Sequence, residues 1–199
     1  MKASNQKDEY FLLTFADRPT IETDFVSDIG EIQDRLAFKV PKGSTTLYDA
    51  VYPALNKIKQ GSNPKKAIVL ITDGDDTASR YSLGAVRKAV QESDCQIFAI
   101  GIELPGEYGF GEGYQGIEAL KEMAESTGGS AYFPSSVYDL EDICEKIAIG
   151  LKNEYVLGYS STNPSKDGRW RKIKIKLHAP KGLPPLSVRA RHGYFAPTG

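Results

Sequence analysis

Long apolar runs, cysteines and histidines are scarce in this sequence. None of its apolar stretches approaches the roughly 18 residues that a membrane-spanning helix needs, so we expect no membrane insertion. The two cysteines, Cys95 and Cys144, lack metal-site or redox spacing, and Cys144 lies on the apolar stripe of an expected helix, which predicts a buried free thiol. The two histidines, His178 and His192, have no nucleophile beside them, so we expect no catalytic triad.

Each part of the chain is also poor in charge of one sign. Basic residues are the minority in residues 1–150, 15 against 24 acidic ones, and acidic residues are rare in residues 151–199, 2 against 10 basic ones. The formal net charge of −1 therefore hides two differently built regions. Charges alternate with apolar residues in the basic region, which is typical of a sheet with one solvated face, so we expect no nucleic-acid binding. The polar residues 1–6 show no signal peptide.

The first region alternates short apolar runs with amphipathic segments. This alternation predicts an α/β fold, in which a mostly parallel sheet carries helices on both faces. The more polar residues 20–26 could return beside the first strand as an edge strand, and residues 27–36 could form a helix. The strands are expected at 10–15, 67–72, 96–102 and 130–133, and the main helices at 46–60, 82–93, 117–127 and 139–151.

The alternation of strands and helices stops near residue 153. Three strand candidates without an intervening helix follow, at residues 155–161, 170–178 and 186–195. We therefore divide the chain into an α/β domain, residues 1–153, and a basic antiparallel β extension packed on it, residues 154–199. The aromatic side chains of the extension, Trp170 among them, predict a contribution to stability rather than to ligand binding.

Three carboxylates follow the most apolar strand, at Asp73, Asp75 and Asp76. Ligands of open α/β sheets lie beyond the carboxyl ends of the strands, and hard cations such as Mg²⁺ take oxygen ligands of this kind. Thr45 and Thr46 stand where the preceding helix begins, and a hydroxyl there could cap the helix or bind a metal. Two interpretations stay open: a metal site, or an acidic surface turn beside a helix cap.

Several segments together resemble the von Willebrand factor type A (VWA) family. The two main motifs are Gly43–Ala50 (GSTTLYDA) and Ala67–Thr77 (AIVLITDGDDT). Residues 11–17, 97–102 and 120–129 fit the flanking strands and a late helix and turn of that family. The tail segments 155–159 (YVLGY), 169–173 and 188–197 resemble the ending of a bacterial group of such domains.

The resemblance implies a Rossmann-like sheet with a metal-ion-dependent adhesion site. Two of the family's ligands correspond to Thr45 and Asp73 here. The others come from an Asp-x-Ser-x-Ser motif that closes the family's first strand, and this sequence lacks that strand and motif, so its VWA-like domain is N-terminally incomplete. The complete family site holds Mg²⁺, Mn²⁺ or Ca²⁺. Because two side chains cannot complete an octahedral shell, we expect this chain to bind such an ion weakly or not at all.

The strand that the family has and this sequence lacks lies between those matching residues 10–15 and 67–72. Both of these apolar runs need cover, and open apolar edges invite aggregation. The helix between them makes a right-handed crossover available. We therefore predict that residues 10–15 pair directly with residues 67–72, in parallel.

A long loop after the third main strand, residues 103–116, carries exposed aromatic candidates for partner binding: Tyr108, Phe110 and Tyr114. Its Gly111–Gly116 segment matches G-x-G-x-x-G literally. A dinucleotide-binding turn needs a strand that runs directly into the first glycine, and here loop residues intervene. We therefore expect no nucleotide binding, and two interpretations of the loop stay open: protein recognition, or a variable insertion that packs on itself.

These observations predict a protein-binding or adhesion-type module and not an enzyme. A metal bound at Thr45 and Asp73 would bridge to an acidic residue of a partner protein. One alternative is a metal-free scaffold, or a fragment of a longer secreted VWA protein, which would place it outside the cytoplasm. Another is a Mg²⁺-dependent phosphotransfer enzyme that uses Asp73 and Asp75, although no general base or phosphate-binding basic group stands near them.

Overall fold

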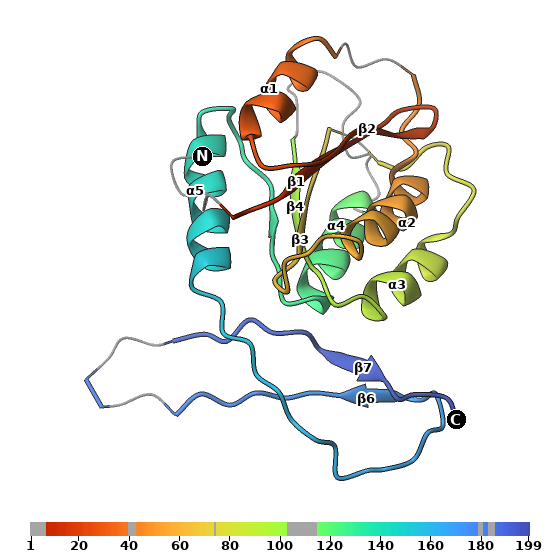
Figure 1. The fold of residues 1–199 in the computed structure, drawn as a ribbon, viewed down its shortest axis with the longest axis vertical. Helices are drawn as coiled ribbons and strands as arrows, with labels where there is room; N and C mark the ends of the chain where they lie inside the picture. The colour runs from red at the N-terminus through yellow and green to blue at the C-terminus, as the bar shows by residue number, and fades with distance from the viewer. Residues whose placement is uncertain (1–6, 40–42, 74, 103–114, 179–180, 183–185) are drawn as a thin grey trace.

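Three parallel strands form the central sheet of the computed structural model, in the order β3 (Ala67–Thr72), β4 (Gln96–Gly101) and β5 (Ala131–Tyr132) (Figure 1). The structure describes residues 7–39, 43–73, 75–102, 115–178, 181–182 and 186–199. β3 pairs with β4 from Ala67↔Gln96 to Thr72↔Gly101, and β4 pairs with β5 at Ala99↔Ala131 and Ile100↔Tyr132. β4 is therefore the central strand.

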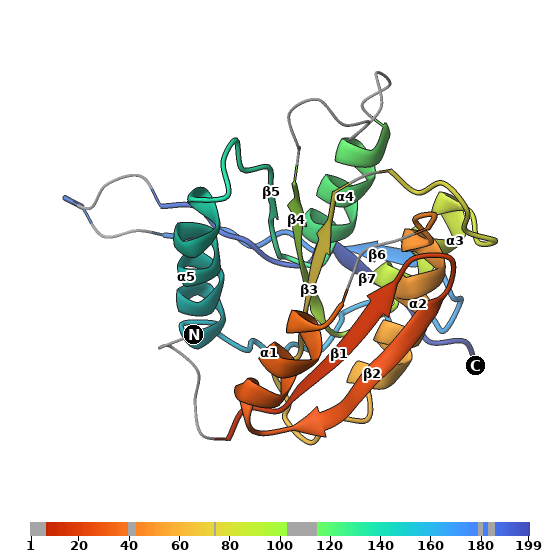
Figure 2. The ribbon, with the colours of Figure 1, turned by 90° about the horizontal axis from the view of Figure 1, so that it is seen from above.

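Helices cover both faces of β4, as predicted. On one face α2 (Leu47–Ile58), α3 (Leu83–Gln91) and α4 (Gln115–Ser126) pack their apolar stripes against the sheet. On the other face α5 (Asp139–Lys152) packs Ile143 and Ile147 against Phe98 and Ile100 of β4 (Figure 2). Burying each such side chain contributes about 1.5–3 kcal/mol, so this layered core is the main source of stability.

Helix boundaries follow from capping residues in the sequence. Ser82 precedes α3, and its hydroxyl accepts the backbone N–H of Ala85 at 3.3 Å. Gly128 follows α4 with φ of 86°, the left-handed conformation that a glycine adopts without strain. Both residues predicted these boundaries from the sequence: α3 begins directly after Ser82, and α4 ends shortly before Gly128.

The pairing predicted for the first strand is wrong. β1 (Tyr10–Phe15) pairs with β2 (Pro19–Val26) in an antiparallel hairpin, from Tyr10↔Val26 to Phe15↔Pro19, and it forms no ladder with β3 (Figure 2). A short turn joins β1 to β2, so this hairpin closes at little cost in chain entropy, and the other edge of β1 pairs with none of the described strands. The edge strand expected at residues 20–26 is confirmed, and α1 (Ile29–Ala37) packs on this hairpin.

The C-terminal extension is antiparallel, as predicted, but its strands are short. β6 (Trp170–Lys172) pairs with β7 (Gly193–Phe195), and the rings of Trp170 and Phe195 meet edge to face with their centroids 4.9 Å apart. The strand predicted at residues 155–161 is absent, although the whole segment is described. No ladder in the described residues includes this segment, although the ring of Tyr159 meets that of Tyr194 in β7 with their centroids 6.2 Å apart.

Polar contacts fasten the extension to the α/β body. Arg191 donates to the Asp94 carboxylate at 2.8 Å and forms an antiparallel bridge with Thr127. The next residue, His192, donates its backbone N–H to the carbonyl of Ser126 at 3.1 Å. These contacts join the segment before β7 to the end of α4 and the loop before β4.

The cysteines and the membrane prediction have different outcomes. Cys95 is buried and free, but Cys144 is exposed, which corrects the expectation of a buried thiol there. The apolar stripe of α5 that faces the sheet is narrower than the sequence pattern suggested, with Ile143 and Ile147 as its buried residues. In the described parts of the chain, no helix is long and apolar enough to cross a bilayer.

Candidate functional site

Two loops that carry predicted site residues are hydrogen-bonded to each other beyond the carboxyl end of β3. The backbone N–H of Thr45 donates to the Thr77 hydroxyl at 2.9 Å. In return, the backbone N–H groups of Thr77 and Ala78 donate to the Thr45 carbonyl at 2.9 and 3.3 Å. Thr45 is half-buried and Asp73 is exposed. The structure therefore brings the Thr45 loop against the loop that Asp73 begins.

The end of β1 fastens the Thr45 loop from its other side. The carboxylate of Asp17 accepts the Ser44 backbone N–H at 2.8 Å and the Ser44 hydroxyl at 3.0 Å, and these two bonds lower the pKa of Asp17. Gly43 takes a φ of 100°, and a Cβ there would lie 2.5 Å from the Asp17 carboxylate. The loop therefore requires glycine at this position, for its conformation as well as for space.

The N-terminus of α2 is capped by residues of the loop that follows Asp73. Asp76 accepts the Tyr48 backbone N–H at 3.1 Å, and the Ser79 hydroxyl accepts that of Asp49 at 2.9 Å. In exchange, the Asp49 carboxylate accepts the backbone N–H groups of Arg80 and Tyr81 at 2.8 and 3.0 Å. Asp76 therefore acts as a helix cap supplied from outside the helix.

The pKa of Tyr48 depends on the acidic residues near it. Burial raises the pKa of Tyr48, and the negative charges of Asp76 and Asp75 act in the same direction. Both carboxylates therefore lie close enough to Tyr48 to oppose its ionisation. Asp73, the carboxylate that the resemblance implies as a ligand, is not among these neighbours.

The hydroxyl of Thr46 is buried and finds no hydrogen-bond partner among the described residues. Thr46 occupies the cap position of α2, yet its side chain makes no capping bond. Only 2% of the residue is exposed. A buried hydroxyl without a partner costs free energy, so it marks a place where a water or another ligand would be stabilising.

The described residues do not fit a complete cation site. No three carboxylate, histidine or cysteine side chains gather in the described ranges as a set that could hold a metal ion. Thr45, Asp73 and the unpartnered hydroxyl of Thr46 leave most of an octahedral shell unfilled.

The remaining partner candidates from the sequence cannot be placed. Tyr108, Phe110 and Tyr114 lie outside the described residues, as does most of the Gly111–Gly116 segment. The capping roles of Asp17, Asp49 and Asp76 were missed by sequence reasoning. The signal that could have found Asp17 and Asp76 is their position just after an apolar strand, where loops of an open sheet converge.

A model of the von Willebrand factor type A domain matches residues 1–146. The chain belongs to this family. The resemblance read from the motifs, and the Rossmann-like fold that it implied, are confirmed. A search of curated proteins gave no match.

Solved VWA structures share this fold. A von Willebrand factor type A protein from Catenulispora acidiphila has a TM-score of 0.61 at 16% identity, over 75% of this chain and 35% of that one. The protein BatB from Bacteroides thetaiotaomicron has a TM-score of 0.57 at 14% identity, over 77% and 83%. Proximal thread matrix protein 1 of the mussel byssus, with a zinc-occupied MIDAS motif, has a TM-score of 0.55 at 22% identity, over 70% of this chain and 34% of that one.

Family membership supports the general class of function. VWA domains are known for protein interaction and adhesion and are generally not enzymes. The family also commonly binds a divalent metal at its MIDAS site, and the zinc in the byssus protein is an example in another member. These are properties of the family and of that relative.

Proposed function

We propose that this VWA chain is a protein-binding module whose binding face surrounds Thr45 and Asp73. The observation that carries the proposal is the exchange of hydrogen bonds that joins Thr45 and Asp49 of α2 to residues 77–81. Groups held in place before binding lose less conformational entropy when a partner docks. Asp73 and the partly exposed Thr45 stand at the edge of this rigid platform.

A divalent cation would strengthen this face without being built into it. Thr45 and Asp73 would be its protein ligands, with the Thr46 hydroxyl adjacent in sequence. Water would fill the remaining positions, as Mg²⁺ usually keeps several waters. A partner carboxylate could replace one of these waters, so we propose weak ion binding that an acidic partner residue completes.

Calorimetry and NMR together test this proposal. We expect Mg²⁺ or Mn²⁺ to bind with a dissociation constant of about 1 mM or weaker, and Asp73→Asn to abolish the heat. Mn²⁺ should broaden the amide signals of Thr45, Thr77 and Ala78 first. The matched control is Asp34→Asn, which neutralises an exposed acid on α1 and should change neither result.

A peptide addition then addresses partner binding. An aspartate-containing tripeptide should shift the same three amide signals more strongly when Mg²⁺ is present. Shifts confined to other parts of the protein, or Asp73→Asn binding as well as the parent chain, would contradict the proposal. The phosphotransfer alternative, which uses Asp73 and Asp75, gains no supporting observation, because no three carboxylate, histidine or cysteine side chains gather around a metal position in the described residues.

A further inference from the structure

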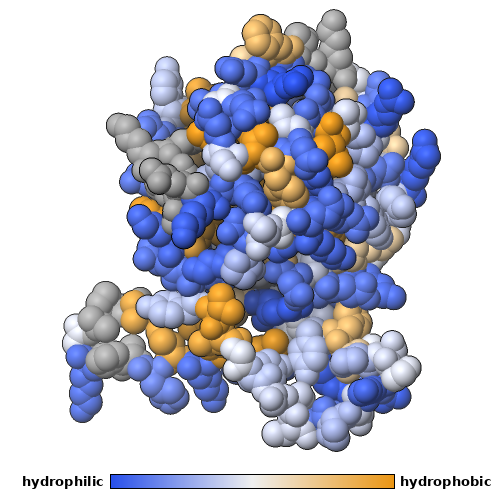
Figure 3. Space-filling model, in the orientation of Figure 1, coloured by the Kyte–Doolittle hydropathy of each residue, from blue (hydrophilic) through white to orange (hydrophobic). Residues whose placement is uncertain are grey.

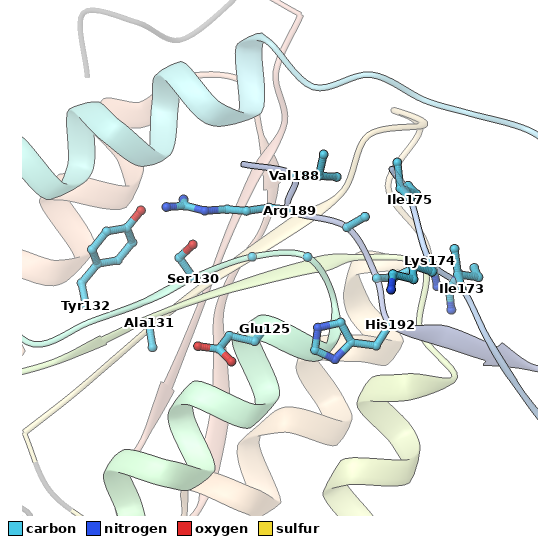
Figure 4. A pocket seen from close by; sticks show the side chains of 14 residues that line it. Glu125, Ser130, Ala131, Tyr132, Ile173, Lys174, Ile175, Val188, Arg189 and His192 are labelled. Atoms are coloured by element: carbon cyan, nitrogen blue, oxygen red, sulfur yellow. The ribbon is translucent and has the colours of Figure 1, made fainter. Parts of the chain in front are cut away.

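A wedge-shaped cavity of about 520 Å³ separates β5 from the C-terminal extension (Figure 4). Its narrow end is the antiparallel bridge between Thr127 and Arg191. There the chains touch, since a Cβ on Gly128 would lie 2.9 Å from the backbone of Ala190. Beyond this point residues 128–132 and 188–191 line the cavity from opposite sides. The volume lies within the range of about 300–1,000 Å³ typical of ligand pockets.

Both long walls of the wedge offer backbone groups for hydrogen bonding. β5 pairs only with β4 in the described part of the sheet, so its outer edge faces the cavity without a strand partner. On the opposite wall, no backbone hydrogen bond joins Val188 or Arg189 to any other described residue. Unpaired strand edges are templates for a further strand. An extended chain between these walls would therefore find hydrogen-bonding groups on both sides.

The charges that line the wedge favour a negatively charged ligand. Lys174, Arg189 and His192 are exposed at its walls, whereas Glu125 is the one acidic residue in its described lining. Figure 4 shows the Arg189 side chain extended along the cavity. The guanidinium of Arg191 is not available to a ligand, because it donates to the Asp94 carboxylate. The cations left for a ligand therefore outnumber the single carboxylate.

Apolar side chains alternate with these cations. Ile173 and Ile175 flank Lys174 along one segment, and Val188 precedes Arg189 on the other. Ile175 and Val188 are 41% and 42% exposed, which is high for large apolar residues in a sheet-like region. A strand whose residues alternate acidic and apolar side chains would match both features.

We propose that this wedge binds an acidic, extended segment of a partner protein as an added strand between β5 and residues 188–190. The partner's backbone would pair with the two open edges, and its carboxylates would meet Lys174 and Arg189. This site is separate from the face around Thr45. It lies beside the N-terminal end of β5, whereas Thr45 lies beyond the carboxyl end of β3 in the same parallel sheet.

Fluorescence anisotropy with a labelled octapeptide of alternating glutamate and valine tests the proposal on the full chain. We expect this peptide to bind at least tenfold more tightly than a lysine–valine peptide of equal length. Arg189→Glu and Lys174→Glu should each weaken binding about fivefold or more. Arg35→Glu on α1 makes the same charge change away from the wedge and should alter the affinity less than twofold. Equal losses in this control would overturn the proposal.

A backbone-modified peptide separates strand addition from simple charge attraction. N-methylation of alternate residues removes main-chain donors but keeps every carboxylate, so it should weaken binding at least tenfold. If the methylated peptide binds as well as the parent, or if double-stranded DNA competes at equal charge concentration, the wedge is only a general anion surface and the proposal fails. The melting temperature of each variant verifies that these exposed substitutions leave the fold intact.

Discussion

Similar apolar residues are buried in the α/β body and exposed in the C-terminal extension. In the body, Ile100 of β4 is fully buried between two helix layers. In the extension, Val156 is 74% exposed, and Figure 3 shows apolar side chains gathered on the surface of this part of the molecule. A sheet buries its residues only where a second layer covers it. The difference teaches that apolar content alone does not make a core.

The two regions also differ in how they are held together. The body rests on a continuous cluster of side chains from three helices and two strands. The extension rests on two aromatic pairs, a short ladder and the contacts of Arg191 and His192. Regions with few buried contacts open at a smaller free-energy cost than the core. We therefore expect the extension to unfold locally before the body does.

The largest effect expected from this contrast is a core truncation. Ile100→Ala should lower the free energy of unfolding by about 2–5 kcal/mol, because it removes a fully buried side chain and leaves a cavity. Leu157→Ala, at a residue that is 72% exposed, should change it by less than about 0.5 kcal/mol. Urea denaturation measures both. Equal losses would show that residues 155–159 are buried in solution.

A smaller and local effect is expected at Trp170. Trp170→Ala removes the ring that packs on Phe195 and should destabilise the hairpin by about 2 kcal/mol. Hydrogen exchange should become faster at the Ala196 amide, which donates to the carbonyl of Arg169 at 2.9 Å. The Ile100 amide should be unaffected. Uniform acceleration over both regions would mean that they unfold as one unit.

A weaker effect is expected where the two regions meet. Asp94→Asn removes the ion pair between Asp94 and Arg191. The side chain of Asp94 in this pair is 90% exposed. Exposed pairs contribute about 0.2–1 kcal/mol and are screened by salt. The loss should therefore appear in hydrogen exchange at the His192 amide at low ionic strength and shrink as salt is added. A loss that salt leaves unchanged would point to a role of Asp94 other than charge pairing.

The smallest effect concerns acid conditions. The pKa of Asp167 is lowered by the backbone N–H of Arg169 and by the side chain of Arg171. Because the pKa in the folded protein lies below the ordinary value of 3.8, this carboxylate stabilises the hairpin above pH 3.8 and loses that effect as the pH falls through the folded pKa. An NMR titration of Asp167 should show the low pKa, and Asp167→Asn should remove this acid sensitivity. An unchanged acid response in the variant would assign it to another group.

Local patterns in the sequence predicted most of the body. The apolar runs at 67–72 and 96–101 and the caps Ser82 and Gly128 are properties of neighbouring residues, so they could be read directly. The return of residues 20–26 beside β1 was also predicted, whereas the expected pairing of β1 with β3 was wrong, because local patterns do not show which distant strands meet. The strand predicted at residues 155–161 is absent for a related reason. Strand propensity is a local property, whereas a strand forms only when it pairs with the edge of another strand.

The candidate site divides in the same way. Thr45 and Asp73 came from a family resemblance, and the hydrogen bonds that join their two loops were not visible in the sequence. Whether Asp76 faces a cation or caps α2 depends on the direction of its side chain, which tertiary contacts set. The wedge beside β5 was also missed, because residues 128–132 and 188–191 are distant in sequence and are brought together by the bridge at Arg191.

The exchange of hydrogen bonds between α2 and residues 76–81 also has a mechanical meaning. Each segment supplies acceptors for the other, with Asp76 and Ser79 serving the helix and Asp49 serving the loop. A pulling force applied at Asp73 would therefore load these bonds together rather than one after another. Such a connection resists tension better than a single contact.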